Sequence, residues 1–187
     1  MTLTQPHPEA DQVQQRMQRW LERAVIGLNL CPFAKAVHVK QQIHYAVSAA
    51  TDAGELMADL RHELLDLAQA DPAERDTTLL VAPDALADFL DFNDGLGRAD
   101  RLLRKLGLDG VLQIASFHPN YQFADASPDD VTNCSNRAPY PTLHLLREES
   151  IARAVQSVPD AADIYERNRQ TLKTLGFVGW TALALDN

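Results

Sequence analysis

Side chains that can donate, accept or transfer protons are concentrated in one stretch of the chain, residues 118–147. Two histidines of this stretch, His118 and His144, have the chemistry of a catalytic acid and base. Arg137 carries a planar guanidinium that suits a carboxylate or a phosphate, because it offers paired donors. We expect the other substrate-binding groups of this stretch to be Asn120, Asn136, Tyr140 and Arg147.

A second reactive group is Cys31, in the string GLNLCPFAK at residues 27–35, where Pro32 fixes a turn. A histidine from residues 118–147 could activate its thiol as a nucleophile. The alternative is a buried, small apolar side chain, since free cysteine is among the most buried residue types. We expect Cys31 to be largely buried and to form no disulfide with Cys134.

Each of these residues also has a purely structural explanation. His118 and His144 could hold the loop by hydrogen bonds, and Arg147 is followed by two glutamates that could pair with it. A Cys/His metal site is a further alternative, but the chain has no CxxC, HxxxH or HExxH spacing, so we assign no metal ligand. Arg137 is the better candidate for an anion anchor, because it lies among prolines with no neighbouring acid.

Residues 118–141 form a long segment without a regular pattern, a feature that is uncommon in compact domains and often functional. The segment follows the carboxyl end of a predicted strand, where open α/β sheets tend to bind ligands. Four prolines restrict its backbone, at positions 119, 128, 139 and 141. We therefore expect an ordered loop that packs over the turn at residues 29–35.

Hydrophobic periodicity predicts the elements that position these groups. Helices are predicted where apolar residues recur at spacings of three and four, and Asp52 with Glu55 forms a cap at the start of one of them. The predicted helices cover about residues 11–28, 52–70, 83–106 with an interruption at 93–97, 147–156 and 159–175. The predicted strands are 37–47, 77–82 and 111–117. Strand 37–47 would carry His38 and His44 on one solvated face. Gly107 and Gly176 are predicted to end helices.

Strands that alternate with helices indicate an α/β or α+β sandwich, with a small mixed sheet of about three to five strands covered by helices. The main alternative is a split βαβ, ferredoxin-like sheet with a further strand near residues 143–146. The chain shows no internal repeat and no Gly/Ser linker, so we expect residues 1–187 to form a single domain, flexible over residues 1–10.

Composition excludes several classes of function. Lysine and arginine number 17 against 26 acids, a net charge of −9 that argues against nucleic acid or an anionic membrane as the main partner. No glycine-rich phosphate loop and no GxSxG elbow occurs, which disfavours nucleotide-binding folds and serine hydrolases. The chain has neither a signal-peptide pattern nor an apolar membrane span, so we expect a cytoplasmic protein with reduced thiols. The sequence identifies no cofactor and no oligomeric state.

Four strings taken together carry a family resemblance: NLCPFAK, FHPNYQF, NRAPYPTLHLLRE and ERNRQTLKTLGFVGW. With them, nearly the whole chain after the first ten residues resembles the bacterial family known as domain of unknown function 1415. The resemblance implies a small, single-domain bacterial protein and no particular activity. It also implies a serine where this chain has Ala138, and no cysteine at the position of Cys134, so it gives neither residue a role.

Three hypotheses for function follow from these observations. The first is an enzyme for a small polar or anionic substrate, with Arg137 as anchor, His118 or His144 as acid or base, and Cys31 as nucleophile. The second is a non-catalytic ligand-binding or interaction domain that uses the same loop. The third is a Cys/His metalloprotein. The first predicts that Arg137 and a histidine share one concave pocket.

Overall fold

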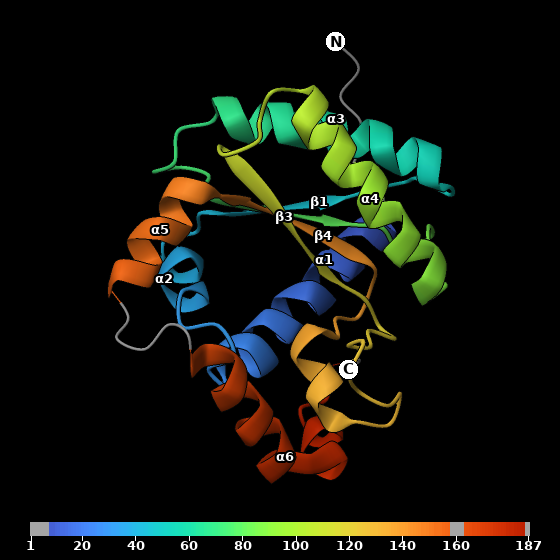
Figure 1. The fold of residues 1–187 in the computed structure, drawn as a ribbon, viewed down its shortest axis with the longest axis vertical. Coiled ribbons are helices and arrows are strands. Elements are labelled where there is room, and N and C mark those ends of the chain that lie inside the picture. Colours follow the sequence, from blue (N-terminus) through green and yellow to red (C-terminus); the bar gives the residue numbers. More distant parts are fainter. Residues whose placement is uncertain (1–7, 158–162, 186–187) are drawn as a thin grey trace.

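The centre of the fold is a four-stranded sheet with the order β1-β2-β4-β3, seen between two layers of helices in Figure 1. Its strands are β1 (Ile43–Val47), β2 (Thr77–Val81), β3 (Leu112–Phe117) and β4 (Thr142–Arg147). The structure is a computed structural model, which describes residues 8–157 and 163–185. Strand β1 is parallel to β2, and β4 is antiparallel to both of its neighbours. It follows that β1, β2 and β3 all run in the same direction.

This topology brings four chain segments to one edge of the sheet. The carboxyl ends of β1, β2 and β3 lie at that edge, together with the beginning of β4. Ser48, Pro83 and His118 follow the three parallel strands, and Tyr140 precedes β4. The edge is therefore the place where loops from distant parts of the sequence can build a site.

Helices cover both faces of the sheet. On one face α3 (Ala53–Gln69) and α4 (Phe89–Lys105) bury leucines against Leu80, Leu143 and Leu145. On the other face α1 (Pro8–Trp20) continues into the π-helix η1 (Leu21–Ile26) and packs on Leu79 and Val81. Within the described residues, the remaining helices are α2 (Ala34–Val39), the 3₁₀ turn η2 (Val131–Asn136), α5 (Glu148–Ser157) and α6 (Ile164–Ala182).

The expected α+β sandwich with a small mixed sheet is confirmed. The further strand near residues 143–146 exists as β4, and it lies between the parallel strands β2 and β3, as in a split βαβ unit. The sheet as a whole is not ferredoxin-like, because that motif has the element order β-α-β-β-α-β and this chain has β1-α3-β2-α4-β3-β4.

The prediction of one strand over residues 37–47 is wrong in its first half. Residues 34–39 form the helix α2, and the strand begins only at Ile43. Gln41 has a φ of 58°, so the chain turns there in the left-handed region and cannot remain extended. His38 and His44 consequently lie on different elements, where they contact Glu22 and Glu63 respectively.

The helix predicted over residues 83–106 exists, but its predicted start at residue 83 and its predicted interruption at 93–97 are wrong. Helix α4 begins at Phe89, after Asp88 accepts hydrogen bonds from the backbone N–H groups of Leu90 and Asp91, and it runs unbroken to Lys105. Residues 83–88 form a loop in which Leu86 has a φ of 55°. Asp88 is the stronger start signal because its carboxylate accepts from two N–H groups that the helix leaves unpaired.

Gly176 ends a regular helical segment, as predicted, and a second helical segment follows it. That glycine has a φ of 64° and kinks α6, which resumes and reaches Ala182. The first residues of the predicted helix 159–175, and most of the segment expected to be flexible at the N-terminus, lie outside the described residues. Among the helices that the structure describes, none is both long enough and apolar enough to span a bilayer.

Residues 118–141 are largely irregular, as expected, apart from η2. Cys134 of η2 packs with Leu30 and Leu172 in one buried cluster, so the loop does reach the turn that follows η1. Trp20 of α1 also donates its indole N–H to the backbone carbonyl of Arg137, at 2.9 Å. These contacts fix the loop against both α1 and α6.

Candidate functional site

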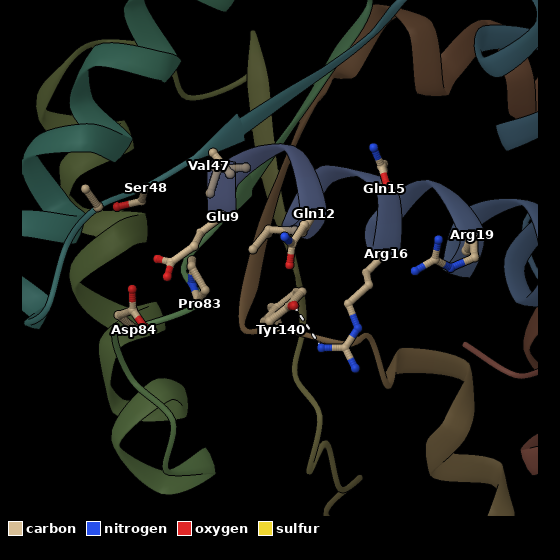
Figure 2. Close-up of a pocket in the computed structure, with 13 residues that line it drawn as sticks. Glu9, Gln12, Gln15, Arg16, Arg19, Val47, Ser48, Pro83, Asp84 and Tyr140 are labelled. Carbon is tan, nitrogen blue, oxygen red and sulfur yellow. Dashed lines mark hydrogen bonds between the residues drawn. The ribbon is translucent and has the colours of Figure 1, made fainter. Parts of the chain in front are cut away.

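A pocket of about 710 Å³ lies between α1 and the edge of the sheet where β1 and β2 end (Figure 2). We call it the α1 pocket and define it by six of its lining residues: Glu9, Arg16, Arg19, Ser48, Asp84 and Tyr140. Its volume is within the range of about 300–1,000 Å³ that is typical of small-molecule sites. The position agrees with the rule that open α/β sheets bind ligands at the carboxyl ends of their strands.

Helix α1 supplies one wall of the α1 pocket because of its residue spacing. Glu9, Gln12, Arg16 and Arg19 recur at intervals of three and four, which places them on one side of the helix. Val13, Met17 and Trp20 occupy the adjacent side and are buried against the sheet. The apolar stripe therefore orients the helix, and this orientation directs its polar side toward the pocket.

Arg16 and Tyr140 meet at the side of the pocket nearest β4. The guanidinium donates a hydrogen bond from Nη1 to the Tyr140 hydroxyl at 3.0 Å, drawn as a dashed line in Figure 2. Its Cζ also lies 5.6 Å from the centre of the tyrosine ring. Because the phenol oxygen accepts this bond, its own O–H remains available as a donor to a bound oxygen atom.

Arg19 lies one turn further along α1. Its Nε atom is buried, and it finds no hydrogen-bond acceptor among the residues that the structure describes. A buried donor without a partner costs about 1–3 kcal/mol, so such atoms are rare in folded proteins and require an explanation. Because Arg19 also lines the α1 pocket, a small rotation of its side chain would bring the Nε to an oxyanion bound there, which would supply the acceptor.

The opposite end of the α1 pocket is acidic. Figure 2 shows the Glu9 carboxylate directed toward Pro83 and Asp84, away from the two arginines. Ser48 lies at this same end of the pocket (Figure 2) and is only 5% exposed. Its hydroxyl donates to Asp59 at 2.6 Å and accepts from the backbone N–H of Ala50, so it shapes the loop after β1.

His118 is fully buried, and both of its ring nitrogens are in hydrogen bonds. The Nδ1 atom accepts from the backbone N–H of Asn120 at 3.0 Å, so Nε2 carries the proton and donates to the Leu86 carbonyl at 3.1 Å. Phe89 and Phe92 flank the ring. Burial lowers the pKa of this imidazole, and the bond to Leu86 partly opposes that effect. The ring therefore joins the loop after β3 to the loop after β2.

His144 lies on the opposite face of the sheet, beside Phe117. The Thr77 hydroxyl donates to the Leu145 carbonyl at 2.6 Å, so it accepts from His144 Nε2 at 2.8 Å. Burial lowers the pKa of His144 to about 4. Near neutral pH the ring is uncharged and holds β4 to β2.

The two cysteines are free, with Cys31 half-buried and Cys134 buried. Burial raises the pKa of both thiols, which favours the protonated and less nucleophilic form. Cys31 packs at the border of the cluster between α1 and the sheet, and Cys134 packs between Leu30 and Leu172.

Arg137 directs its guanidinium into its own loop. Its Nε donates to the Tyr121 carbonyl at 3.1 Å and an Nη donates to the Pro128 carbonyl at 2.9 Å. Asn136 acts in the same way, since its amide donates to the Ser116 carbonyl at 3.3 Å. Both side chains hold the backbone of residues 116–137 in place.

Arg147 and Asn120 are the two remaining candidates from the sequence. An Nη of Arg147 donates to the backbone carbonyls of Leu67, Ala70 and Arg75, which ties the end of α3 to β4. Asn120 is exposed, and its backbone N–H serves His118.

The structure thus brings only Tyr140, among the sequence candidates, to the α1 pocket. His118 and His144 lie on opposite faces of the sheet, and Cys31 and Arg137 do not line the pocket. Sequence reasoning missed Arg16, Arg19, Glu9 and Asp84. The sequence does contain one signal for the arginines. Arg16 follows Gln12 by four residues and Arg19 follows Arg16 by three, so all three lie on the polar side of a strongly amphipathic helix.

Comparison with known proteins identifies the family to which the chain belongs. Residues 12–182 match the model of a family described as a protein of unknown function (DUF1415). No curated protein and no solved structure matches the chain. Among the described residues, no three His, Cys, Asp or Glu side chains are grouped so that they could hold a metal ion. The family match covers far more than half of the 187 residues, and the chain belongs to the DUF1415 family.

Proposed function

We propose that the protein binds a small anionic molecule in the α1 pocket, with Arg16 and Arg19 as the groups that receive the anion. The observation that carries the proposal is the buried Nε of Arg19, which has no acceptor within the described residues and belongs to a residue lining the pocket. An oxyanion would satisfy this donor and accept a second bond from the Tyr140 hydroxyl.

The proposal retains the substrate class expected from the sequence and changes the residues that bind it. Arg137 is engaged with two carbonyls, whereas Arg19 has a donor available. His118 and His144 are held by internal hydrogen bonds, so the proposal is one of binding, with no step assigned to Cys31 or to either histidine. The proposed setting is the cytoplasm of a bacterium, supported by the two free cysteines.

The test is a titration of the protein with inorganic phosphate and with butanoate, followed by calorimetry and by the Nε–H NMR signals of its arginines. We expect saturable binding that moves the Nε–H signal of Arg19, which is assigned by its loss in Arg19→Met. Removal of a charged hydrogen-bond donor is worth about 1.5–3 kcal/mol, so Arg19→Met should weaken binding at least about tenfold.

Arg153→Met is the matched control, because Arg153 carries the same charge on an exposed part of α5, outside the pocket. It should leave the affinity unchanged. If neither anion binds saturably, or if Arg19→Met and Arg153→Met bind equally well, the proposal is wrong.

A further inference from the structure

The α1 pocket has two ends of opposite charge. Among its lining residues the charged groups are two arginines, Arg16 and Arg19, and two acids, Glu9 and Asp84. Figure 2 shows the acids together at one end and the arginines toward the other. The formal charges of the wall therefore cancel, while their separation leaves a field along the length of the pocket.

The separation follows from the geometry of α1. Glu9 and Arg16 are seven residues apart, which corresponds to about 10 Å along a helix, and Arg19 lies about 15 Å from Glu9 on the same scale. These side chains share one side of the helix, so the two ends of the pocket open onto the same space. A single elongated molecule of small size can contact both ends.

From this arrangement we infer that the ligand is zwitterionic, with an oxyanion held at Arg16 and Arg19 and a protonated amine held at Glu9 and Asp84. The inference rests on the proposed anion site and adds the second charge. A simple anion would leave the acidic end facing an uncharged group, and a dianion would place a charge against Glu9 and Asp84, which is unfavourable between like charges. An ammonium several bonds from the oxyanion matches both ends.

The separation also selects within the class of amino acids. In an α-amino acid the ammonium and the carboxylate are attached to the same carbon atom, so they are too close together to reach Glu9 and Arg16 at once. An ω-amino acid, or a diamino acid that uses its side-chain amine, separates the charges by a flexible chain. The expected ligand therefore has an amine and a carboxylate or phosphate at opposite ends of a short aliphatic chain.

The experiment compares matched pairs of ligands that differ only by the amine. The pairs are 4-aminobutanoate with butanoate, 6-aminohexanoate with hexanoate, and 8-aminooctanoate with octanoate. We expect at least one amine-bearing member to bind about tenfold more tightly than its partner in calorimetric titrations, with the preference changing along the series. Glu9→Gln and Asp84→Asn should each reduce that preference, and the double variant should abolish it.

Two controls separate this inference from the proposed function. Arg19→Met should weaken an ω-amino acid and its amine-free partner by the same factor, leaving their ratio unchanged. Asp100→Asn removes an exposed acid of α4 outside the pocket and should change nothing. A carboxylate that binds through Arg19 with no preference for any amine overturns the zwitterion and leaves the anion site intact. Failure of all carboxylates and of phosphate to bind overturns both.

Discussion

Residues 118–147 and the polar side of α1 make opposite use of their polar side chains. The first region contains most of the groups that sequence analysis selects, and nearly all of them are hydrogen-bonded to the protein itself. His118, Asn136, Arg137 and Arg147 each donate to at least one backbone carbonyl. The Nε of Arg147 is also buried without an acceptor among the described residues, but Arg147 does not line the α1 pocket. The polar side of α1 resembles an ordinary solvated helix surface in sequence, yet it presents Arg19 to a pocket with a donor unsatisfied.

The difference shows that the type of a residue is weaker evidence for a site than the state of its hydrogen bonds. A long loop without regular structure must find partners for its own N–H and C=O groups, and polar side chains are the nearest supply. A ligand site keeps donors that the fold does not satisfy, at a cost in stability. The two regions should therefore respond in opposite ways to the loss of a polar side chain.

The largest effect is expected for His118→Leu. The substitution leaves the Asn120 N–H and the Leu86 carbonyl without their partner, so we expect the free energy of unfolding to fall by about 3–4 kcal/mol. Urea denaturation measures this change, and His62→Leu, at an exposed histidine on α3, should have almost no effect. Retained stability in His118→Leu would mean that the loop does not depend on this ring.

An acid-dependent loss of stability is expected from His144. Its pKa of about 4 in the folded protein is below the ordinary value of 6.5, so the unfolded chain binds the proton more readily. Stability should therefore fall as the pH decreases from about 6.5 to about 4, by about 2–3 kcal/mol from this group. Measured as unfolding free energy against pH, the slope in this window should be smaller in His144→Gln. An identical slope in the variant would show that other groups cause the acid sensitivity.

The smallest effect on stability is expected for Arg19→Met, and it separates the two regions most sharply. The substitution keeps an unbranched apolar stem and removes a buried donor that has no acceptor among the described residues. We expect the free energy of unfolding to change by less than about 0.5 kcal/mol, or to rise slightly, while phosphate binding weakens at least about tenfold. A loss of more than about 2 kcal/mol in urea denaturation would show that Arg19 supports the fold, as Arg137 does.

Much of the fold can be predicted from the sequence, because local signals and burial agree. The leucines of α3 have helical spacing after an Asp52 cap, and the apolar run of β2 is buried at every position. The errors arise where two readings of a short segment compete. Alternation over residues 37–47 resembles a strand, but the positive φ of Gln41 divides it into α2 and β1. The sequence pattern alone does not distinguish one strand from a helix followed by a strand, and the turn that forms at Gln41 in the folded protein decides it.

The sequence alone determined the α+β class, the apolar stripe of α1 and the chemical character of residues 118–147. Tertiary structure decided which polar groups are satisfied, because the partners of His118 and Arg147 are backbone carbonyls about 30 and 80 residues away in the chain. It also decided that the arginines of α1 meet the ends of β1 and β2 at the α1 pocket. A single sequence does not carry that information, since a hydrogen bond depends on which atoms the complete fold brings within about 3 Å of each other.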